Sequence, residues 1–353
     1  MKEILRSGAD ISRRPGRSST LARTLRSTAA PRAGAPETTA CSPKRITLPG
    51  AAVDLRVRAR VDDLPGRLEI SAPDLRISFK GVTIDPRSGG VLTKEVGERA
   101  AHATRYVATV LKEFGARDLR VTVESEIPPA SGLGSSASVV VATLGALSRH
   151  LALDLSTDEI AKEAHRIEKS VQDGLGSPTD TALAAFGGYQ IVEGSAKPIE
   201  LPEIKLVVGF SGTPHDTRAE VEKVQSFRAR YPEIVDPIFR AAGEISKRAP
   251  GFIEGGRLEE LGELMDANHG LLEAIGVGTR ELSELVYASR GAGRAYGAKL
   301  TGAGGGGCMI ALPRTGPDDV LRVMTAIAQA KGEPFSVVTG CPGLRVEGAA
   351  DER

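Results

Sequence analysis

Residues 128–138 of this sequence form a Gly- and Ser-rich stretch, PPASGLGSSAS, between an alternating segment at 119–125 and an apolar segment at 139–153. Alternation with a period of two predicts a strand before the stretch, and the longer apolar run predicts a helix after it. Glycines permit positive φ angles and close backbone approach, and the first N–H groups of a helix lack partners within the helix. The stretch therefore predicts a loop that binds an anion at a helix N-terminus. The alternative is an ordinary serine N-cap after a glycine turn.

A second Gly-rich stretch, TGAGGGG at 301–307, lies between the apolar segments 297–300 and 308–312. So many glycines inside a hairpin cost conformational entropy without adding packing contacts. We therefore expect a ligand or another backbone to approach this loop closely; the alternative is a loosely ordered hairpin. Neither stretch is a Walker A loop or a dinucleotide-binding GxGxxG motif.

Two acidic residues complete the candidate site. Glu168 lies late in a predicted helix at 156–170, which Ser156 and Glu159 would begin with a capping box. Asp180 follows Ser177 near the start of another short predicted helix. One carboxylate can hold a divalent cation, and a second one beside a substrate hydroxyl can orient it or take its proton. By itself, an aspartate in this position is more often an acid that the helix dipole favours.

Composition limits the class of protein. The 353 residues suffice for two domains, and the net charge of +1 provides no general attraction to nucleic acid or an anionic membrane. The three cysteines form no CxxC motif, and no apolar run reaches the ~18 residues of a membrane span. We expect a cytoplasmic protein with a small-molecule partner and with neither nucleic acid nor membrane as a partner. A homodimer is one assembly that we consider.

The pattern along the chain predicts an α+β fold with two lobes and mainly antiparallel sheets. Residues 1–40 are rich in Arg, Ser, Ala and Pro, which indicates a disordered tail; they also resemble a transit peptide or sequence upstream of a misassigned start codon. We expect an N-terminal domain at 41–200 and a C-terminal domain at 201–353, with the boundary in a Pro-containing linker near 198–204.

Several side chains have structural interpretations. The segment 53–61 alternates apolar residues with acidic and basic ones, which predicts a half-buried strand with Arg56, Arg58 and Arg60 on its solvated face. Cys308 follows the second Gly-rich stretch into a strand, where it is expected in the core. His269 has no convergent partners in the sequence.

The two Gly-rich stretches and the acidic segment between them, in this order, resemble the GHMP kinase superfamily over residues 53–348. Within it, VQDGLGSPTDTALAAFGG (171–188) and MDANHGLLEAIGV (265–277) are most similar to archaeal-type mevalonate kinases. The resemblance implies a two-lobed fold with the nucleotide site in the cleft between the lobes. It further implies transfer of the ATP γ-phosphoryl group to the 5-hydroxyl of mevalonate, in isoprenoid biosynthesis, with Mg²⁺. Two alternatives stay open: a non-catalytic nucleotide-binding relative, and a kinase for another acceptor, such as phosphomevalonate or the 3-hydroxyl of mevalonate.

The resemblance also assigns roles to single residues. For ATP it implies Pro129, Gly132, Leu133, Gly134, Ser135, Ser136, Ala137, Gly302, Gly304 and Gly305. For Mg²⁺ it implies Ser136 and Glu168, and for catalysis Asp180 and Lys44. Thr217 and Asp180 would lie beside the substrate.

The sequence departs from the family in its first motif. The family has a strand that opens with Pro-x-Lys, followed by Phe-Gly-Glu-His and an apolar run. Here SPKRITLPGAAVDLRV has Lys44 or Arg45 in the place of the family's lysine and lacks the Glu-His segment. We expect Pro49 and Gly50 to form a tight turn between two strands. In the family the absent segment lines the acceptor pocket and places the motif lysine beside the catalytic aspartate. The position of Lys44 relative to Asp180 therefore depends on the short connection through Pro49 and Gly50. A gene-model error, a diverged but active kinase and a protein that has lost catalysis would each explain it.

Overall fold

The computed structural model describes residues 48–72, 98–128, 131–172, 174, 176–192, 195–214 and 216–347, together with the strand backbone at 3–4 and 82–83. Lys44 and Pro129 lie outside these ranges, as does nearly all of the predicted tail at 1–40. Among the described helices, none combines the length and the apolar character needed to cross a bilayer.

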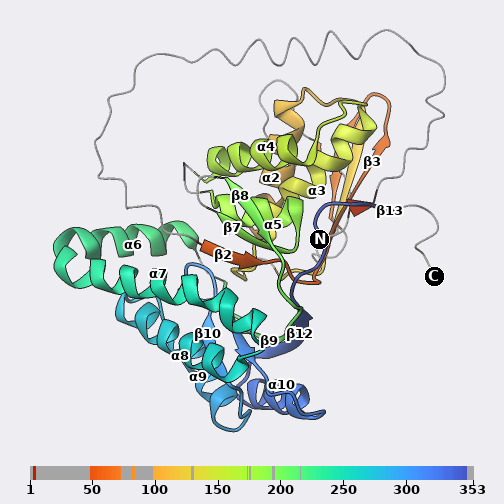
Figure 1. The fold of residues 1–353 in the computed structure, drawn as a ribbon. Helices are drawn as coiled ribbons and strands as arrows, with labels where there is room; N and C mark the ends of the chain where they lie inside the picture. Colours follow the sequence, from red (N-terminus) through yellow and green to blue (C-terminus); the bar gives the residue numbers. More distant parts are fainter. Residues whose placement is uncertain are drawn as a thin grey trace.

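The N-terminal half contains two sheets and four helices among its described residues (Figure 1). In chain order the elements are β2 (Leu48–Ala51), β3 (Val57–Asp63), β4 (Leu68–Ser71), β5 (Val82–Thr83), α2 (Glu98–Glu113), β6 (Leu119–Ser125), α3 (Ser135–His150), α4 (Thr157–Val171), α5 (Pro178–Phe186), β7 (Tyr189–Val192) and β8 (Ala196–Ile199). One sheet has the strand order β3-β6-β4-β5 and the other β2-β7-β8. Within them only the pair β4 and β6 is parallel.

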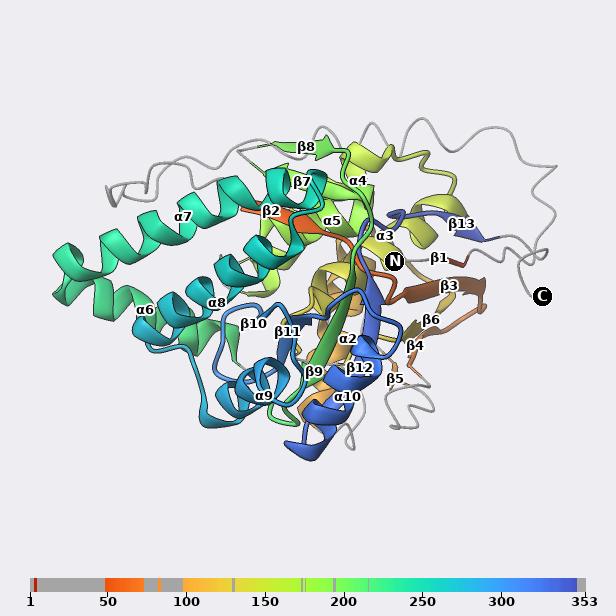
Figure 2. The ribbon, with the colours of Figure 1, turned by 60° about the horizontal axis from the view of Figure 1, so that its bottom comes forward.

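The C-terminal half is built on one antiparallel sheet in the order β10-β11-β9-β12. Its elements are β9 (Lys205–Phe210), α6 (Thr217–Arg230), α7 (Pro232–Glu254), α8 (Leu258–Ala274), α9 (Arg280–Arg290), β10 (Gly297–Leu300), β11 (Cys308–Leu312), α10 (Asp319–Gln329) and β12 (Glu333–Val338). A short strand, β13 (Val346–Glu347), pairs in parallel with β1 (Glu3–Ile4). Figure 2 shows the long helices α7 and α8 beside each other, with α8 facing β10. The predicted α+β class with mainly antiparallel sheets is confirmed.

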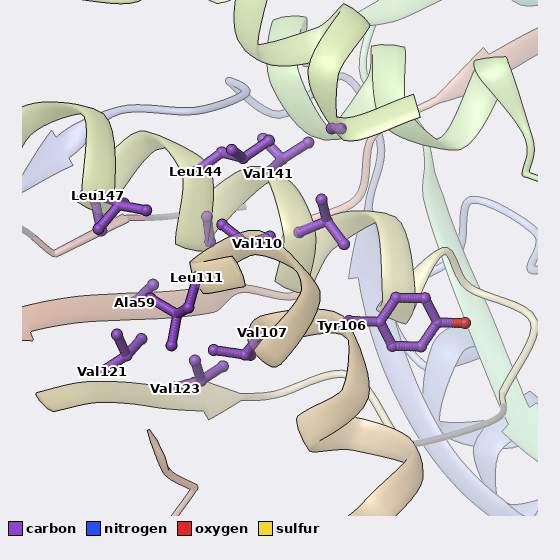
Figure 3. Close-up of a cluster of buried hydrophobic side chains, with 14 of the residues drawn as sticks. Ala59, Tyr106, Val107, Val110, Leu111, Val121, Val123, Val141, Leu144 and Leu147 are labelled. Atoms are coloured by element: carbon purple, nitrogen blue, oxygen red, sulfur yellow. The ribbon is translucent and has the colours of Figure 1, made fainter. Parts of the chain in front are cut away.

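The predicted alternation of buried and solvated side chains over residues 53–61 is confirmed only in part. Val57, Ala59 and Val61 of β3 are fully buried under α2 and α3, as Figure 3 illustrates for Ala59. The strand begins at Val57 rather than at residue 53. The prediction that Arg56 lies on a solvated face is wrong: the residue precedes the strand, is buried, and donates from its guanidinium to the Pro342 carbonyl at 2.9 Å.

The structure corrects two expectations about connections. Pro49 and Gly50 do not form a turn; they lie within β2, which pairs with β7 at the edge of its sheet, where a proline that cannot donate a hydrogen bond is tolerated. Pro198, expected in a linker, lies within β8, so the extended connection to β9 covers residues 200–204. The domain boundary itself stays a prediction.

The two halves are joined by shared apolar packing and by a returning C-terminal segment. Leu55 and Leu133 each pack against buried clusters of both halves. Val53 forms a β-bridge with Thr339, and Gly188 N–H donates to the Cys341 carbonyl at 2.8 Å. Loops from both halves can therefore meet at one place.

Candidate active site

The loop before α3 leaves a helix N-terminus available to a ligand. Gly132 and Gly134 have φ angles of 75° and 72°, a region that other residues rarely adopt. Gly134 is the N-cap, and no described side chain caps the helix there. The serine N-cap alternative is therefore wrong. The helix begins at Ser135, and all of α3 is described, with no acidic residue in its first turn to compete with an anion.

Neighbouring residues hold this loop firmly in place. Ala137 is fully buried, and Leu133 packs against the apolar clusters of both halves. The carbonyl of Ser131 accepts a 2.9 Å hydrogen bond from Cys308 N–H, at the start of β11. Because Cys308 directly follows the second Gly-rich stretch and is fully buried, as expected, this bond ties the two loops together.

The second Gly-rich loop, 301–307, is tightly packed, which excludes the loosely ordered hairpin. A Cβ atom on Gly302 would lie 3.0 Å from the Cα of Gly132 in the first loop. A Cβ on Gly304 would lie 2.2 Å from the carbonyl oxygen of Val277, so no larger residue fits. The N–H of Gly305 donates to the same carbonyl at 2.9 Å, so Gly305 shapes the loop while its own donor is engaged.

Glu168 connects three helices from a buried position. Its side chain is 1% exposed, and its Oε1 accepts from Ser136 Oγ at 2.7 Å and from Gln172 Nε2 at 3.2 Å. The backbone N–H of Ser177, the N-cap of α5, lies near enough to lower the pKa of this carboxyl group. Its second oxygen, Oε2, is buried without a hydrogen-bond partner in the described part of the chain. A buried carboxylate oxygen with no donor is unusual, and a cation would satisfy it.

The pKa of the Glu168 carboxyl group lies above the ordinary glutamate value. Burial raises the pKa of Glu168 to about 7; the Ser136 hydrogen bond opposes this rise, and the negative charge of Asp180 adds to it. Tyr106 on α2 reaches the same place: burial raises its pKa, and a hydrogen bond with Ser136 lowers it. Figure 3 shows the Tyr106 hydroxyl directed away from the apolar cluster.

Asp180 lies opposite the N-terminus of α3. Ser177 caps α5 by accepting from Asp180 N–H at 3.3 Å, which fixes the first turn of that helix. A Cβ on Gly134 would lie 3.7 Å from the Cβ of Asp180 and 3.9 Å from its Oδ1. Burial raises the pKa of Asp180, against the effect of its hydrogen bond with Ser177. Asp180 is thus an acid in the first turn of a helix and also a half-buried carboxylate facing the N-terminal end of α3.

The described residues suit Mg²⁺, which takes only some of its ligands from the protein, better than they suit a metal whose ligands all come from protein side chains. No group of three or more His, Cys, Asp or Glu side chains suited to a metal occurs among the residues with described positions. Ser136 and Glu168 could supply two oxygen ligands, and Mg²⁺ usually keeps waters and substrate phosphates as its remaining ligands. The unpaired Oε2 of Glu168 is the observation that supports this fit.

Comparison with known proteins establishes the family. Residues 101–188 match the family model of the GHMP kinases N terminal domain, and residues 249–330 match that of the GHMP kinases C terminal. The Mevalonate kinase of Thermococcus gammatolerans is 40% identical over 310 residues, which covers 84% of this chain and 91% of that protein. The chain belongs to the GHMP kinase family. The Mevalonate kinase of Pyrococcus horikoshii is 41% identical over 310 residues, covering 84% of this GHMP kinase and 90% of the relative.

Solved structures confirm the GHMP kinase fold. The Mevalonate kinase of Methanococcus jannaschii has a TM-score of 0.69 at 23% identity, covering 84% of this chain and 92% of that one. A structure of the L. major mevalonate kinase in complex with R-mevalonate gives the same TM-score and identity, covering 85% and 91%. The two matched family ranges contain the loop before α3 with Asp180, and the loop at 301–307, respectively.

The structure of this GHMP kinase thus brings most of the predicted site residues together. Thr217 is the first residue of α6, and that helix reaches the second loop through Glu220, whose Oε1 would lie 2.6 Å from a Cβ on Gly305. Sequence reasoning did not find Gln172 or Tyr106, which carry no local signal. The sequence places Ser177 at a predicted helix start, and its role as N-cap could also have been predicted, because a serine before a proline is typical of that position.

Proposed function

We propose that this GHMP kinase transfers the γ-phosphoryl group of ATP to the 5-hydroxyl of mevalonate. The observation that carries the chemistry is the position of Asp180, opposite the uncapped N-terminus of α3. The acceptor is inferred from the archaeal relatives that bear the name Mevalonate kinase, at about 40% identity over most of their length.

The phosphates of ATP would bind at the start of α3. The N–H groups of Ser135 and Ser136 point out of the first turn, and the helix dipole favours negative charge there. Gly302 and Gly304 let the second loop approach closely, so its backbone closes the other side of this site. Binding at a helix terminus fixed by both loops would hold the transferred group in line with its acceptor.

Asp180 would act on the acceptor side. A carboxylate beside the substrate hydroxyl orients it and accepts its proton as the phosphoryl group transfers. The raised pKa of Asp180 makes it a stronger base than an exposed aspartate. Thr217 at the start of α6 is proposed to contact the substrate, and Lys44, outside the described residues, stays a predicted partner of Asp180.

Ser136 and Glu168 are proposed to hold Mg²⁺, which when bound would offset the negative charge of the ATP phosphates. Glu168 would have to be deprotonated for this role. Hydrogen bonds from Ser136 and Gln172 favour the charged carboxylate and keep it aimed at the site.

The shortened first motif is compatible with an active enzyme. Residues 48–51 still form a strand that packs on α5, the helix that carries Asp180. A Cβ on Gly50 would lie 2.6 Å from Leu183 Cδ1 and 3.0 Å from Thr179 Cγ2. This support of α5 favours the active kinase over the relative that has lost catalysis.

ADP release by the purified chain tests the proposal. It should require Mg·ATP and mevalonate together, and phosphomevalonate, homoserine and galactose should not replace mevalonate. ATP binding without turnover on any of these alcohols would instead identify a non-catalytic nucleotide-binding protein, and turnover with phosphomevalonate alone would change the acceptor. A homodimer and a cytoplasmic location stay predictions.

A further inference from the structure

The strand that leads into the second Gly-rich loop lies at the edge of its sheet. β10 pairs with β11 on one side only, and Thr301 N–H donates to the Cys308 carbonyl at 3.0 Å at the end of the ladder. Ladder bonds alternate along an antiparallel strand, so the backbone groups of Ala298 and Leu300 point outward. Buried backbone groups need partners, and here side chains provide them.

Two charged side chains bind the outward groups of Ala298. Asp266 Oδ1, on α8, accepts from Ala298 N–H at 2.8 Å, and a guanidinium nitrogen of Arg290, on α9, donates to the Ala298 carbonyl at 2.6 Å. The same two side chains form an ion pair, with Arg290 Nε 2.7 Å from Asp266 Oδ1. This arrangement fixes the middle of β10 to both helices.

His269 and Lys299 bind the outward groups of Leu300, the last residue of β10. His269 Nδ1, one turn further along α8, accepts from Leu300 N–H at 3.5 Å, and Lys299 Nζ donates to the Leu300 carbonyl at 2.8 Å. Because Nδ1 is an acceptor, the imidazole proton belongs on Nε2, which lies 3.4 Å from Glu273 Oε1. The hydroxyl of Ser283, on α9, donates to the same Glu273 oxygen at 2.6 Å.

The surroundings of His269 keep its imidazole neutral, as an acceptor role requires. The side chain is 1% exposed, and burial lowers its pKa. The charged groups around it are Glu273 and Asp266 on α8, Arg290 on α9 and Lys299 on β10; the two acids act to raise its pKa and the two bases to lower it. Burial also lowers the pKa of Lys299 to about 8.

We propose that His269 is a positioning residue for the loop at 301–307, which it holds against the phosphate-binding end of α3 through the N–H of Leu300. Leu300 immediately precedes Thr301, and the Thr301 carbonyl oxygen would lie 3.3 Å from a Cβ on Gly132. A shift of Leu300 would therefore move the contact between the two loops. His269 touches no substrate in this arrangement; it acts through the backbone. The inference rests on the proposed kinase function, because it concerns the loop that would enclose ATP.

The test compares His269→Leu with His269→Gln. Leucine fills similar space but leaves the Leu300 N–H without an acceptor, whereas the glutamine amide can accept from Leu300 and donate toward Glu273. For the leucine variant we expect Mg·ATP affinity, measured by calorimetry, to fall about tenfold, with a matching rise in KM for ATP. The glutamine variant should stay within about twofold of the parent protein. His150→Leu, which removes a histidine paired with Asp63 at the far end of α3, is the matched control and should also stay within about twofold.

Tm is measured for each variant to separate positioning from stability. A leucine variant that loses Tm but binds Mg·ATP normally when folded would overturn the proposal, as would equal loss in the leucine and glutamine variants. If the leucine variant does not fold, His269→Phe replaces it, since a phenyl ring occupies the imidazole site without an acceptor for the Leu300 N–H; normal Mg·ATP binding by that variant would also overturn the proposal. Binding of Mg·ATP by calorimetry does not depend on the acceptor. Parent protein that binds ATP but does not turn over mevalonate would contradict the proposed function alone.

Discussion

The Ser136 hydroxyl donates a 2.7 Å hydrogen bond to Glu168 Oε1, while the other oxygen of this buried carboxylate has no hydrogen-bond partner among the described residues. This contact joins the first turn of α3 to the last turn of α4. It places a hydroxyl and a carboxylate together at the helix end where the phosphates are proposed to bind.

Magnesium dependence should vary with pH through Glu168. In the metal-free protein its pKa is about 7, above the ordinary glutamate value, so the protonated form predominates below that pH. A metal must displace this proton, so the apparent Mg²⁺ affinity should fall as pH decreases below about 7, approaching tenfold per pH unit. Mg²⁺ titrations of activity at several pH values measure this. Glu168→Gln should bind Mg²⁺ more weakly and lose this part of the pH dependence, and it provides the baseline for protonation of ATP itself. Equal pH dependence in both proteins would argue against Glu168 as a ligand.

Asp180→Asn should lower kcat by about a thousandfold and leave Mg·ATP affinity within about twofold, because the carboxylate acts on the acceptor. Steady-state kinetics and calorimetry measure the two quantities. Asp158→Asn is the matched control, since Asp158 is an exposed acid in the first turn of the neighbouring helix α4. It should lose about 0.5 kcal/mol of stability and no activity. If the Asp180 variant kept its kcat, Asp180 would be only a helix-terminal acid.

Gly304→Ala should be far more damaging than Gly66→Ala. The two glycines have similar φ angles of 80° and 75°, so both substitutions carry a backbone penalty of about 1–2 kcal/mol. Around Gly66 no described atom lies within 4 Å of the added Cβ, whereas at Gly304 that atom would overlap the Val277 carbonyl. We expect denaturant unfolding to show a loss several kcal/mol larger for the Gly304 variant, together with weaker ATP binding. Equal losses would mean that the loop packs less tightly than described.

Gly50→Ala should couple to Leu183→Ala. The added Cβ would meet the end of the Leu183 side chain at 2.6 Å, and truncating that leucine would make room for it. A double-mutant cycle in denaturant should therefore give a favourable coupling of about 1 kcal/mol. Additive losses would show that β2 does not pack tightly against α5 at Gly50. The packing of β2 would then no longer support an active kinase with a shortened first motif.

The parts of the site that could be predicted are those whose structure depends on short stretches of neighbouring residues. The glycines of both loops, the capping box at Ser156 and the acid at Asp180 belong to short patterns whose geometry follows from neighbouring residues. The burial of Arg56 could not be predicted in this way. Its partner Pro342 lies 286 residues further along the chain, and the alternation around Arg56 contains no trace of that contact.

The role of β2 and the partners of His269 depended on tertiary structure in the same way. Pro49 and Gly50 are typical of a turn, but pairing with β7 at a sheet edge overrides this preference. His269 has no partner in its own segment except Glu273, and it meets Leu300 only because β10 is the outermost strand of its sheet. Strand order is a property of the whole fold, and single-sequence patterns do not determine it.

The covered outer side of β10 also bears on how copies of this protein can associate. An exposed edge strand is a template onto which a strand of another molecule can add, either in a specific complex or in an aggregate. Here an incoming strand would first have to displace Asp266, His269, Arg290 and Lys299 from the backbone groups they bind. The side chains that hold the loop thus also oppose extension of the sheet at β10, and strand-to-strand association of this chain would have to use a different edge.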